Sequence, residues 1–170
     1  MKKIFLTTLL CLTTTFMANA QRFALIDMEY ILKNIPAYSS ANSQLESSSK
    51  KWTEEINKAA NEAKDMYEKY QNAKGLTETQ KTQRENAIVE KEKKVAELRK
   101  KYFGPEGEMA KKQKELIGPI EDKIYDAVKV VAQTNGYAMV LDRASASSII
   151  YASIDNDISD EILDQLGYSK

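Results

Sequence analysis

The chain has 170 residues, a formal net charge of zero, no histidine and one cysteine. Cys11 lies in a segment that we expect to be removed, which excludes disulfide scaffolds and thiol enzymes for the mature chain. No nucleophile motif stands out elsewhere, so the residues that most enzymes use for catalysis are largely missing. We also expect neither a cofactor nor a metal.

The N-terminus has the pattern of a secretory signal peptide, residues 1–20. Lys2 and Lys3 form a positive start, and an apolar run follows that is too short to span a bilayer. The small residues "ANA" then form a cleavage site between Ala20 and Gln21. The alternative is a short membrane anchor, which the rapid loss of hydrophobicity in "TTTFMANA" disfavours. We therefore expect an exported chain without stable membrane insertion.

Charge is distributed unevenly along the mature chain. Residues 50–115 hold 17 basic and 13 acidic residues, whereas the rest of the mature chain holds 6 and 12. This charge-rich segment is either the solvated face of a helix or a polyanion site. Export and the mixed signs disfavour nucleic acid as a partner.

A single apolar stripe runs along residues 37–73. Its positions are spaced alternately four and three apart, which is typical of a coiled-coil seam. The residues between them are mostly polar, so the helix can bury one narrow face. The stripe consists of Tyr38, Leu45, Trp52, Ala59, Met66 and Ala73, with Asn42, Ser49, Ile56, Ala63 and Tyr70 as companions.

A tight turn near residues 74–77 is expected to reverse the chain. Gly75 can end a helix in the left-handed conformation, and Thr77 with Gln80 has the spacing of a capping box. A return helix over about 78–134 carries its own heptads, at Ile88, Val95, Leu98, Tyr102, Met109 and Leu116. The first arm alone would be on the order of 55 Å long, so we expect a helical hairpin that projects as a limb.

Two Gly-Pro segments interrupt the return helix, "FGPEGE" at 103–108 and "IGPIED" at 117–122. Each is expected to kink or locally open the helix, either as a fixed bend or as a hinge. A phosphate-binding glycine loop is excluded, because no strand precedes these segments and no Gly-Lys-Ser or Gly-Lys-Thr follows.

The chain ends predict strands at 22–28, 137–141 and 149–154, each apolar on both faces. A short helix should follow, with Ser159 as its N-cap and Gly167 as its end. One chain cannot cover all these faces, so we expect other subunits to do so. The residues expected in this oligomerisation body are Phe23, Leu25, Ile26, Met139, Leu141, Ile150 and Tyr151.

Two further groups of side chains are candidates for a functional site. Asp27 and Asp142 could form a catalytic carboxylate pair, but strand-end carboxylates more often bind backbone N–H groups or a cation such as Arg143. Aromatic and methionine side chains of the limb could contact another protein or could fill the seam, and Tyr67 lies one position off the register. These limb candidates are Met66, Tyr67, Tyr70 and Met109.

An N-terminal "FALIDMEYIL", a long charged hairpin, "GYAMVLD" and "SIIYASIDNDISDEILDQL" together resemble the Skp (OmpH) family of periplasmic chaperones. The resemblance implies an α+β fold in the periplasm: a trimer whose strands form a joint body, with helical limbs that enclose unfolded outer-membrane proteins. Family members are often strongly basic, whereas the mature chain has a net charge of −2.

The expected organisation is a signal peptide (1–20), a body (21–36 and 120–170) and a limb (37–119). The favoured function is an ATP-independent holdase that keeps unfolded outer-membrane proteins from aggregating. The alternative is a structural coiled-coil spacer of the cell envelope, which would bind defined folded partners.

Overall fold

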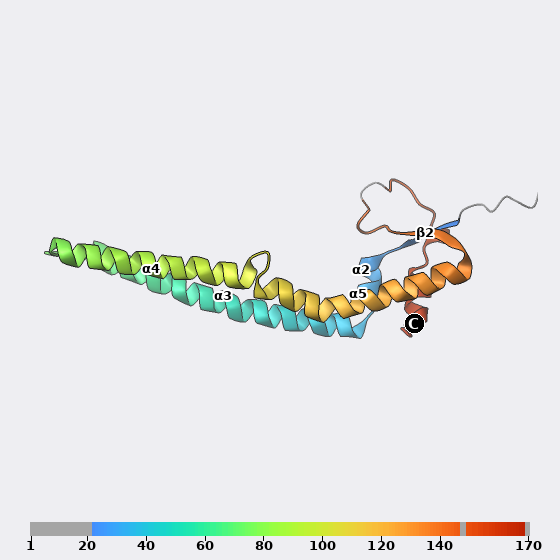
Figure 1. The fold of residues 1–170 in the computed structure, drawn as a ribbon, viewed down its shortest axis with the longest axis horizontal. Coiled ribbons are helices and arrows are strands. Elements are labelled where there is room, and N and C mark those ends of the chain that lie inside the picture. The colour runs from blue at the N-terminus through green and yellow to red at the C-terminus, as the bar shows by residue number, and fades with distance from the viewer. Residues whose placement is uncertain (1–21, 147–148, 169–170) are drawn as a thin grey trace, which may run out of the picture. The chain divides into compact units, whose positions relative to one another are not determined.

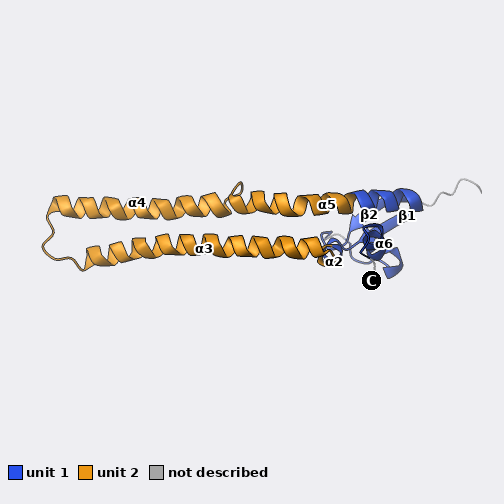
Figure 2. Ribbon diagram, turned by 90° about the horizontal axis from the view of Figure 1, so that it is seen from below, with its two compact units in different colours: residues 1–31, 126–170 blue, residues 32–125 orange. Residues whose placement is uncertain are grey.

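The computed structural model describes residues 22–146 and 149–168. These residues form two compact units: the described residues of 1–31 and 126–170 make a sheet unit, and 32–125 make a hairpin unit (Figure 2). The expected signal peptide lies outside the described residues. No helix in the described ranges is long and apolar enough to cross a membrane.

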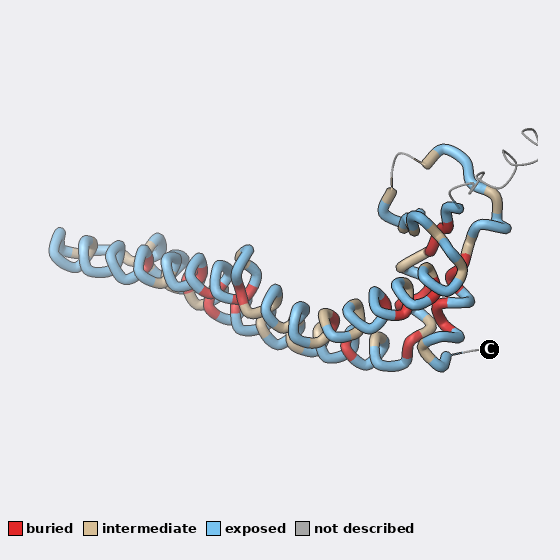
Figure 3. The backbone as a smooth tube through the Cα atoms, turned by 45° about the vertical axis from the view of Figure 1, so that its right-hand side comes forward, coloured by how far each residue is buried: buried red, intermediate tan, exposed pale blue. Residues whose placement is uncertain are grey.

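The hairpin unit is built on two long helices, α3 (Pro36–Gln71) and α4 (Glu78–Phe103), which lie side by side and run antiparallel (Figure 1). Burial along them follows the heptads and is confined to one narrow stripe (Figure 3). The predicted hairpin with a single apolar seam is therefore confirmed. The buried residues are Ala41, Ile56, Ala59 and Ala63 on α3 and Ile88, Val95, Leu98 and Tyr102 on α4. Ala41 is one position off the predicted heptads, whose companion Asn42 is exposed.

The tip of the hairpin has the local chemistry that the sequence predicts. Gly75 has a φ of 75°, which an L side chain rarely adopts. Thr77 Oγ1 accepts a hydrogen bond from the Gln80 backbone N–H at 3.3 Å, and the Gln80 side chain accepts one from the Thr77 N–H at 3.0 Å. This capping box satisfies two of the N–H groups that the start of α4 leaves without helical partners.

The first Gly-Pro segment separates α4 from α5 (Glu108–Asn135), as expected. The Gly104 N–H closes α4 on the Lys100 carbonyl at 3.0 Å, and the Gly107 N–H bonds to the Gly104 carbonyl at 2.9 Å. A Cβ on Gly107 would lie 2.9 Å from the carbonyl oxygens of Lys101 and Tyr102, so the turn leaves no room for a side chain there.

Pro119 was expected to kink or locally open the helix, and the opening is wrong, because α5 continues through this residue. Pro119 has no backbone N–H, so one hydrogen bond of the helix is missing there. Buried side chains hold the helix on both sides of this position, Ile117 before it and Ile124 after it. Packing thus holds a helix that the local sequence alone would interrupt. The first part of α5 lies beside the N-terminal half of α3 (Figures 1 and 2).

The sheet unit pairs the two ends of the chain. Strand β1 (Arg22–Ile26) lies parallel to β2 (Tyr137–Asp142), with Leu25 opposite Leu141. Parallel strands need a long crossover connection, and here the intervening chain includes the whole hairpin. Helix α2 (Met28–Lys33) follows β1, while the 3₁₀ helix η2 (Ile154–Asn156) and α6 (Ser159–Gln165) end the chain. The unit's core includes Ala24, Leu25, Ile26, Ile31, Val131, Ile158, Ile162 and Leu163.

The strand expected at 149–154 is wrong for the described chain, where these residues lie outside any strand until η2 begins. One edge of β1 is paired with β2, and the other is met by residues 157–158, whose Ile158 N–H donates to the Leu25 carbonyl at 2.9 Å. The apolar segment therefore has no edge of β1 to join. Ile150 in this segment is 99% exposed.

Ser159 is also not the N-cap of α6, because the helix already includes it and the capping position is Ile158. Its hydroxyl instead accepts a hydrogen bond from the Asp27 N–H at 2.8 Å. The end of the helix is as expected: Gly167 has a φ of 82°, and the Tyr168 N–H reaches back to the Leu163 carbonyl at 2.8 Å.

Candidate functional site

The four limb candidates differ in how far they are exposed. Met66, Tyr70 and Met109 are partly buried, as heptad positions should be. Tyr67 is 49% exposed, and Gln71 Nε2 donates a hydrogen bond to its hydroxyl at 2.7 Å. Of these four residues, Tyr67 thus offers the largest open apolar surface.

A shallow hollow lies beside Tyr67 on the hairpin unit. Small alanines on α3 leave room there, and Val95 of α4 forms part of the same apolar lining. Lys64 and Glu92 supply one charge of each sign. This hollow could accept an apolar side chain but has no clear preference for a charge. Its lining residues are Ala60, Ala63, Lys64, Tyr67, Glu92 and Val95.

Most charged contacts of the described hairpin join residues three or four apart on one helix, such as Glu46 with Lys50 at 2.8 Å. Three polar contacts join the two helices: Lys91 pairs with Glu62, the Tyr70 hydroxyl donates to Glu85, and the Tyr102 hydroxyl donates to Glu55. The bond to Glu85 raises the pKa of Tyr70. Many of the charges thus pair along the helices, as expected for solvated faces.

An aromatic cluster lies where α4 ends. The ring of Trp52 stacks on Tyr102, with centroids 5.1 Å apart, and meets the ring of Phe103 edge-on at 6.2 Å. The Tyr102 hydroxyl donates to Glu55 Oε2 at 2.7 Å. Sequence reasoning located Trp52 and Tyr102 as seam residues but missed Phe103. Its place as the first residue of the segment "FGPEGE" was the available signal.

The candidate body residues fall into two groups. Leu25 and Ile26 are buried within the sheet unit itself. Phe23, Met139 and Leu141 are substantially exposed on the strands, and the outer edge of β2 has no strand partner among the described residues. Ile150 and Tyr151 are almost fully exposed. Taken together, this part of the described chain carries apolar surface of the kind that marks interaction sites.

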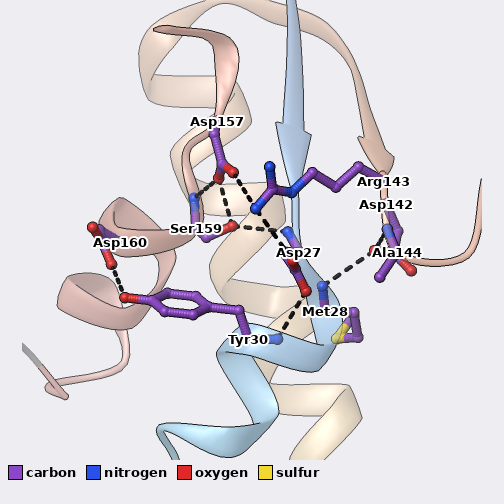
Figure 4. Close-up of polar contacts among 9 residues, drawn as sticks. All are labelled: Asp27, Met28, Tyr30, Asp142, Arg143, Ala144, Asp157, Ser159 and Asp160. Carbon is purple, nitrogen blue, oxygen red and sulfur yellow. Dashed lines mark hydrogen bonds and ion pairs between the residues drawn. The ribbon is translucent and has the colours of Figure 1, made fainter. Parts of the chain in front are cut away.

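Polar contacts tie the ends of the chain together inside the sheet unit (Figure 4). Arg143 Nη2 lies 3.2 Å from Asp27 Oδ2 and 3.3 Å from Asp157 Oδ2. Ser159 donates through its hydroxyl to Asp157 Oδ1 at 2.6 Å, and the Asp27 carboxylate accepts from the Tyr30 N–H at 2.8 Å. The ion pair with Arg143 is confirmed, and these contacts fit a structural role for Asp27.

Asp142 is held by several donors. Its Oδ1 accepts hydrogen bonds from the backbone N–H groups of Met28 at 3.1 Å and Ala144 at 3.0 Å. Burial alone would raise the pKa of Asp142, but these bonds, with those from the side chain and backbone of Ser145, outweigh it and lower the pKa. Asp142 is therefore a stabilised carboxylate that joins β2 to the start of α2.

Comparison with known proteins decides the family. A family model described as "Outer membrane protein (OmpH-like)" matches residues 22–166, a range that includes parts of both units. The chain belongs to the OmpH-like family. The resemblance inferred from the terminal segments is thus confirmed.

Curated relatives match the chain over almost its whole length. It is 25% identical over 170 residues to the chaperone protein Skp of Photorhabdus luminescens, covering 98% of this chain and 99% of that protein. It is also 25% identical over 158 residues to the chaperone protein Skp of Yersinia enterocolitica, covering 92% and 93%. Proteins named as chaperones therefore share the full extent of this chain, including its hairpin.

Proposed function

We propose that the protein is an ATP-independent holdase of the periplasm, which binds unfolded outer-membrane proteins and keeps them from aggregating in transit. The observation that carries this proposal is the family match over residues 22–166, together with relatives named as chaperones at nearly full length. Export would depend on the signal pattern of residues 1–20.

The hairpin unit supplies the binding surface in this proposal. The apolar side chains of its seam are buried between α3 and α4. The outward faces are therefore mostly polar, with scattered apolar side chains such as Tyr67 and Phe103. Each contact with a client is then weak, and affinity arises from many contacts made at once. With no nucleotide to drive release, binding ends when the client folds elsewhere.

The sheet unit supplies the assembly surface, and the proposed state is a homotrimer. Phe23, Met139 and Leu141 would be covered by neighbouring copies, and the unpaired edge of β2 would gain a strand partner.

One experiment tests both parts of the proposal. An unfolded outer-membrane barrel protein is diluted from urea into the purified mature protein, while light scattering reports both aggregation and the mass of the chaperone. We expect the client to stay soluble at about one trimer per client and the folded barrel not to bind.

A hairpin deletion is the matched comparison. Replacing residues 50–110 by a short Gly-Ser turn should preserve the assembly but abolish protection of the client. Removing one or two heptads from each arm next to the tip should reduce protection of large clients before small ones. Full protection by the deletion variant, or equal affinity for folded and unfolded barrels, would contradict the holdase proposal and favour the envelope spacer.

A further inference from the structure

A second hollow on the hairpin unit lies beside the end of α4, next to the aromatic cluster. Residues on α3 line one wall and residues of the last turns of α4 line the other. Ile56 and Asn57 lie three and four residues after Thr53, and Phe103 lies four and three residues after Arg99 and Lys100, so each wall is one face of its helix. The α3 wall consists of Thr53, Ile56 and Asn57, and the α4 wall of Arg99, Lys100 and Phe103, with Gly104 where the helix ends.

The base of this hollow is apolar. Ile56 is buried in the seam, whereas Phe103 keeps 43% of its surface exposed. One side of the Phe103 ring is fixed by its edge-on contact with Trp52, so the exposed part is presented in a defined position. An apolar side chain that entered here would remove this surface from water without displacing any contact of the seam.

The charged residues that line this hollow are all of one sign. Arg99 and Lys100 are its charged lining residues, no carboxylate lines it, and neither cation has an ion-pair partner among the described residues. The next hollow along the chain, at the turn between α4 and α5, is balanced by comparison. It has three carboxylates and three lysines. Lys100 lines both hollows, and Lys111 is paired with Glu108 at 3.2 Å.

We propose that the hollow between Thr53 and Phe103 binds client segments in which an apolar side chain stands next to a carboxylate. This inference rests on the proposed holdase function and names the part of the client that one site selects. The apolar side chain packs against Phe103 and Ile56, and the carboxylate meets Arg99 and Lys100.

An unfolded strand of a membrane barrel has the matching chemistry. Apolar residues that will face lipid alternate with polar residues that will face the lumen, so an apolar side chain commonly has polar neighbours. Thr53 and Asn57 add neutral side chains that can hydrogen-bond to the backbone of an extended segment. A site of this kind selects among segments of the same client without requiring one sequence.

Site-specific crosslinking tests the inference. A benzophenone amino acid is placed at position 57 of the full mature protein, an unfolded barrel protein is added from urea, and crosslinked client peptides are mapped by mass spectrometry. We expect crosslinks to concentrate on client segments that contain an apolar residue beside Asp or Glu. Arg99→Gln with Lys100→Gln should lower that enrichment by about threefold or more, because it removes the charge-assisted contacts.

The matched control is Arg84→Gln with Lys114→Gln, which changes charge equally at exposed helical positions that do not line this hollow. The control should leave the enrichment unchanged, and circular dichroism should show that both double variants remain folded. Crosslinks without preference for acidic segments, or equal enrichment in both variants, would overturn the inference.

The remaining outcomes separate the possible failures. Aggregation of the client is followed in the same sample: an unprotected client contradicts the holdase function and with it this inference, whereas a protected client without enrichment contradicts the inference alone. In the last arm of the experiment, vesicles containing an anionic phospholipid are added together with the client. Crosslinks to lipid that displace those to the client would assign the hollow to a membrane surface instead.

Discussion

The sheet unit and the hairpin unit are stabilised by different kinds of contact. In the sheet unit, Asp27 bonds to Ser159 and Met28 to Asp142, so single hydrogen bonds join residues 132 and 114 positions apart. In the hairpin unit, one stripe of side chains holds two helices that a tight turn connects. One unit depends on bringing distant ends together, whereas the other can form step by step from its tip.

This difference predicts which deletions and substitutions each unit tolerates. A limb with one seam can be shortened by whole heptads, since the remaining turns keep their contacts. The sheet unit has no such repeat, because each of its polar contacts links a particular pair of segments (Figure 4). We therefore expect surface changes to be mild on the hairpin and severe on the sheet unit, which the following substitutions test.

The largest effect is expected from Leu141→Asp. Leu141 is 39% exposed in the described chain, so an isolated subunit would tolerate the charge. In the proposed trimer another copy would bury it, and an unpaired charge buried there costs several kcal/mol. We expect light scattering to show loss of the trimer.

Val89→Asp is the control, since Val89 is 46% exposed on α4. This variant should keep the mass of the wild-type protein. Equal masses for the two variants and the wild type would mean that β2 lies outside the assembly interface. If the wild-type protein is itself monomeric, there is no assembly for Leu141→Asp to disrupt, and the masses of the variants can no longer be compared.

Trp52→Ala should have the next largest effect and should act on the hairpin. The change removes a stacked contact with Tyr102 and an edge contact with Phe103 from a partly buried site. We expect the free energy of unfolding of the hairpin to fall by about 2 kcal/mol, below the range for a fully buried aromatic. Urea unfolding followed by circular dichroism measures it, and Val89→Ala should change stability by less than about 0.5 kcal/mol. A loss as small as the control would show that the cluster is not a stabilising centre.

The hairpin could be predicted well because its signals are local. A capping box, a left-handed glycine and a heptad stripe each depend on residues within a few turns, so Thr77, Gly75 and Ile56 lie as expected. Pro119 is the exception, because packing of the flanking turns holds the helix across it. Tyr67 was identified by its place one position off the register, and it is half exposed.

The sheet unit was harder to predict, since alternation specifies the faces of a strand but not its partner. Residues 149–154 have a strand pattern, yet within one chain both edges of β1 are already occupied. Ser159 has the residue type of an N-cap but bonds to Asp27 from the far end of the chain. The hollow with Arg99 and Lys100 was missed for a similar reason, because it depends on which residues of α3 lie opposite α4.

Asp142→Asn tests how much one polar contact of the sheet unit contributes to stability as the pH is lowered. The lowered pKa of Asp142 means that its ionised form favours the folded state. Its contribution is therefore present above the unfolded pKa of about 4 and is lost as the pH falls through the lower folded value. We expect the wild-type protein to lose more stability than the variant between neutral pH and about pH 3, measured by thermal unfolding. Asp164→Asn, which removes a carboxylate at an exposed position, is the control for the change of charge. Equal losses of stability in the wild-type protein and in Asp142→Asn would contradict the assignment.

The smallest effect is expected from the ion pair that crosses the hairpin, between Lys91 and Glu62. The bond from Lys91 lowers the pKa of Glu62, but both side chains remain in contact with water, where salt screens their attraction. Replacing Lys91 by Gln should therefore leave the urea midpoint unchanged at physiological salt, with a small decrease visible only at low salt. A double-mutant cycle with Glu62→Gln isolates the coupling. A coupling that persists at high salt would mean that the pair is shielded from solvent, for instance by a neighbouring limb, and the hairpin would then share the sheet unit's dependence on specific polar contacts.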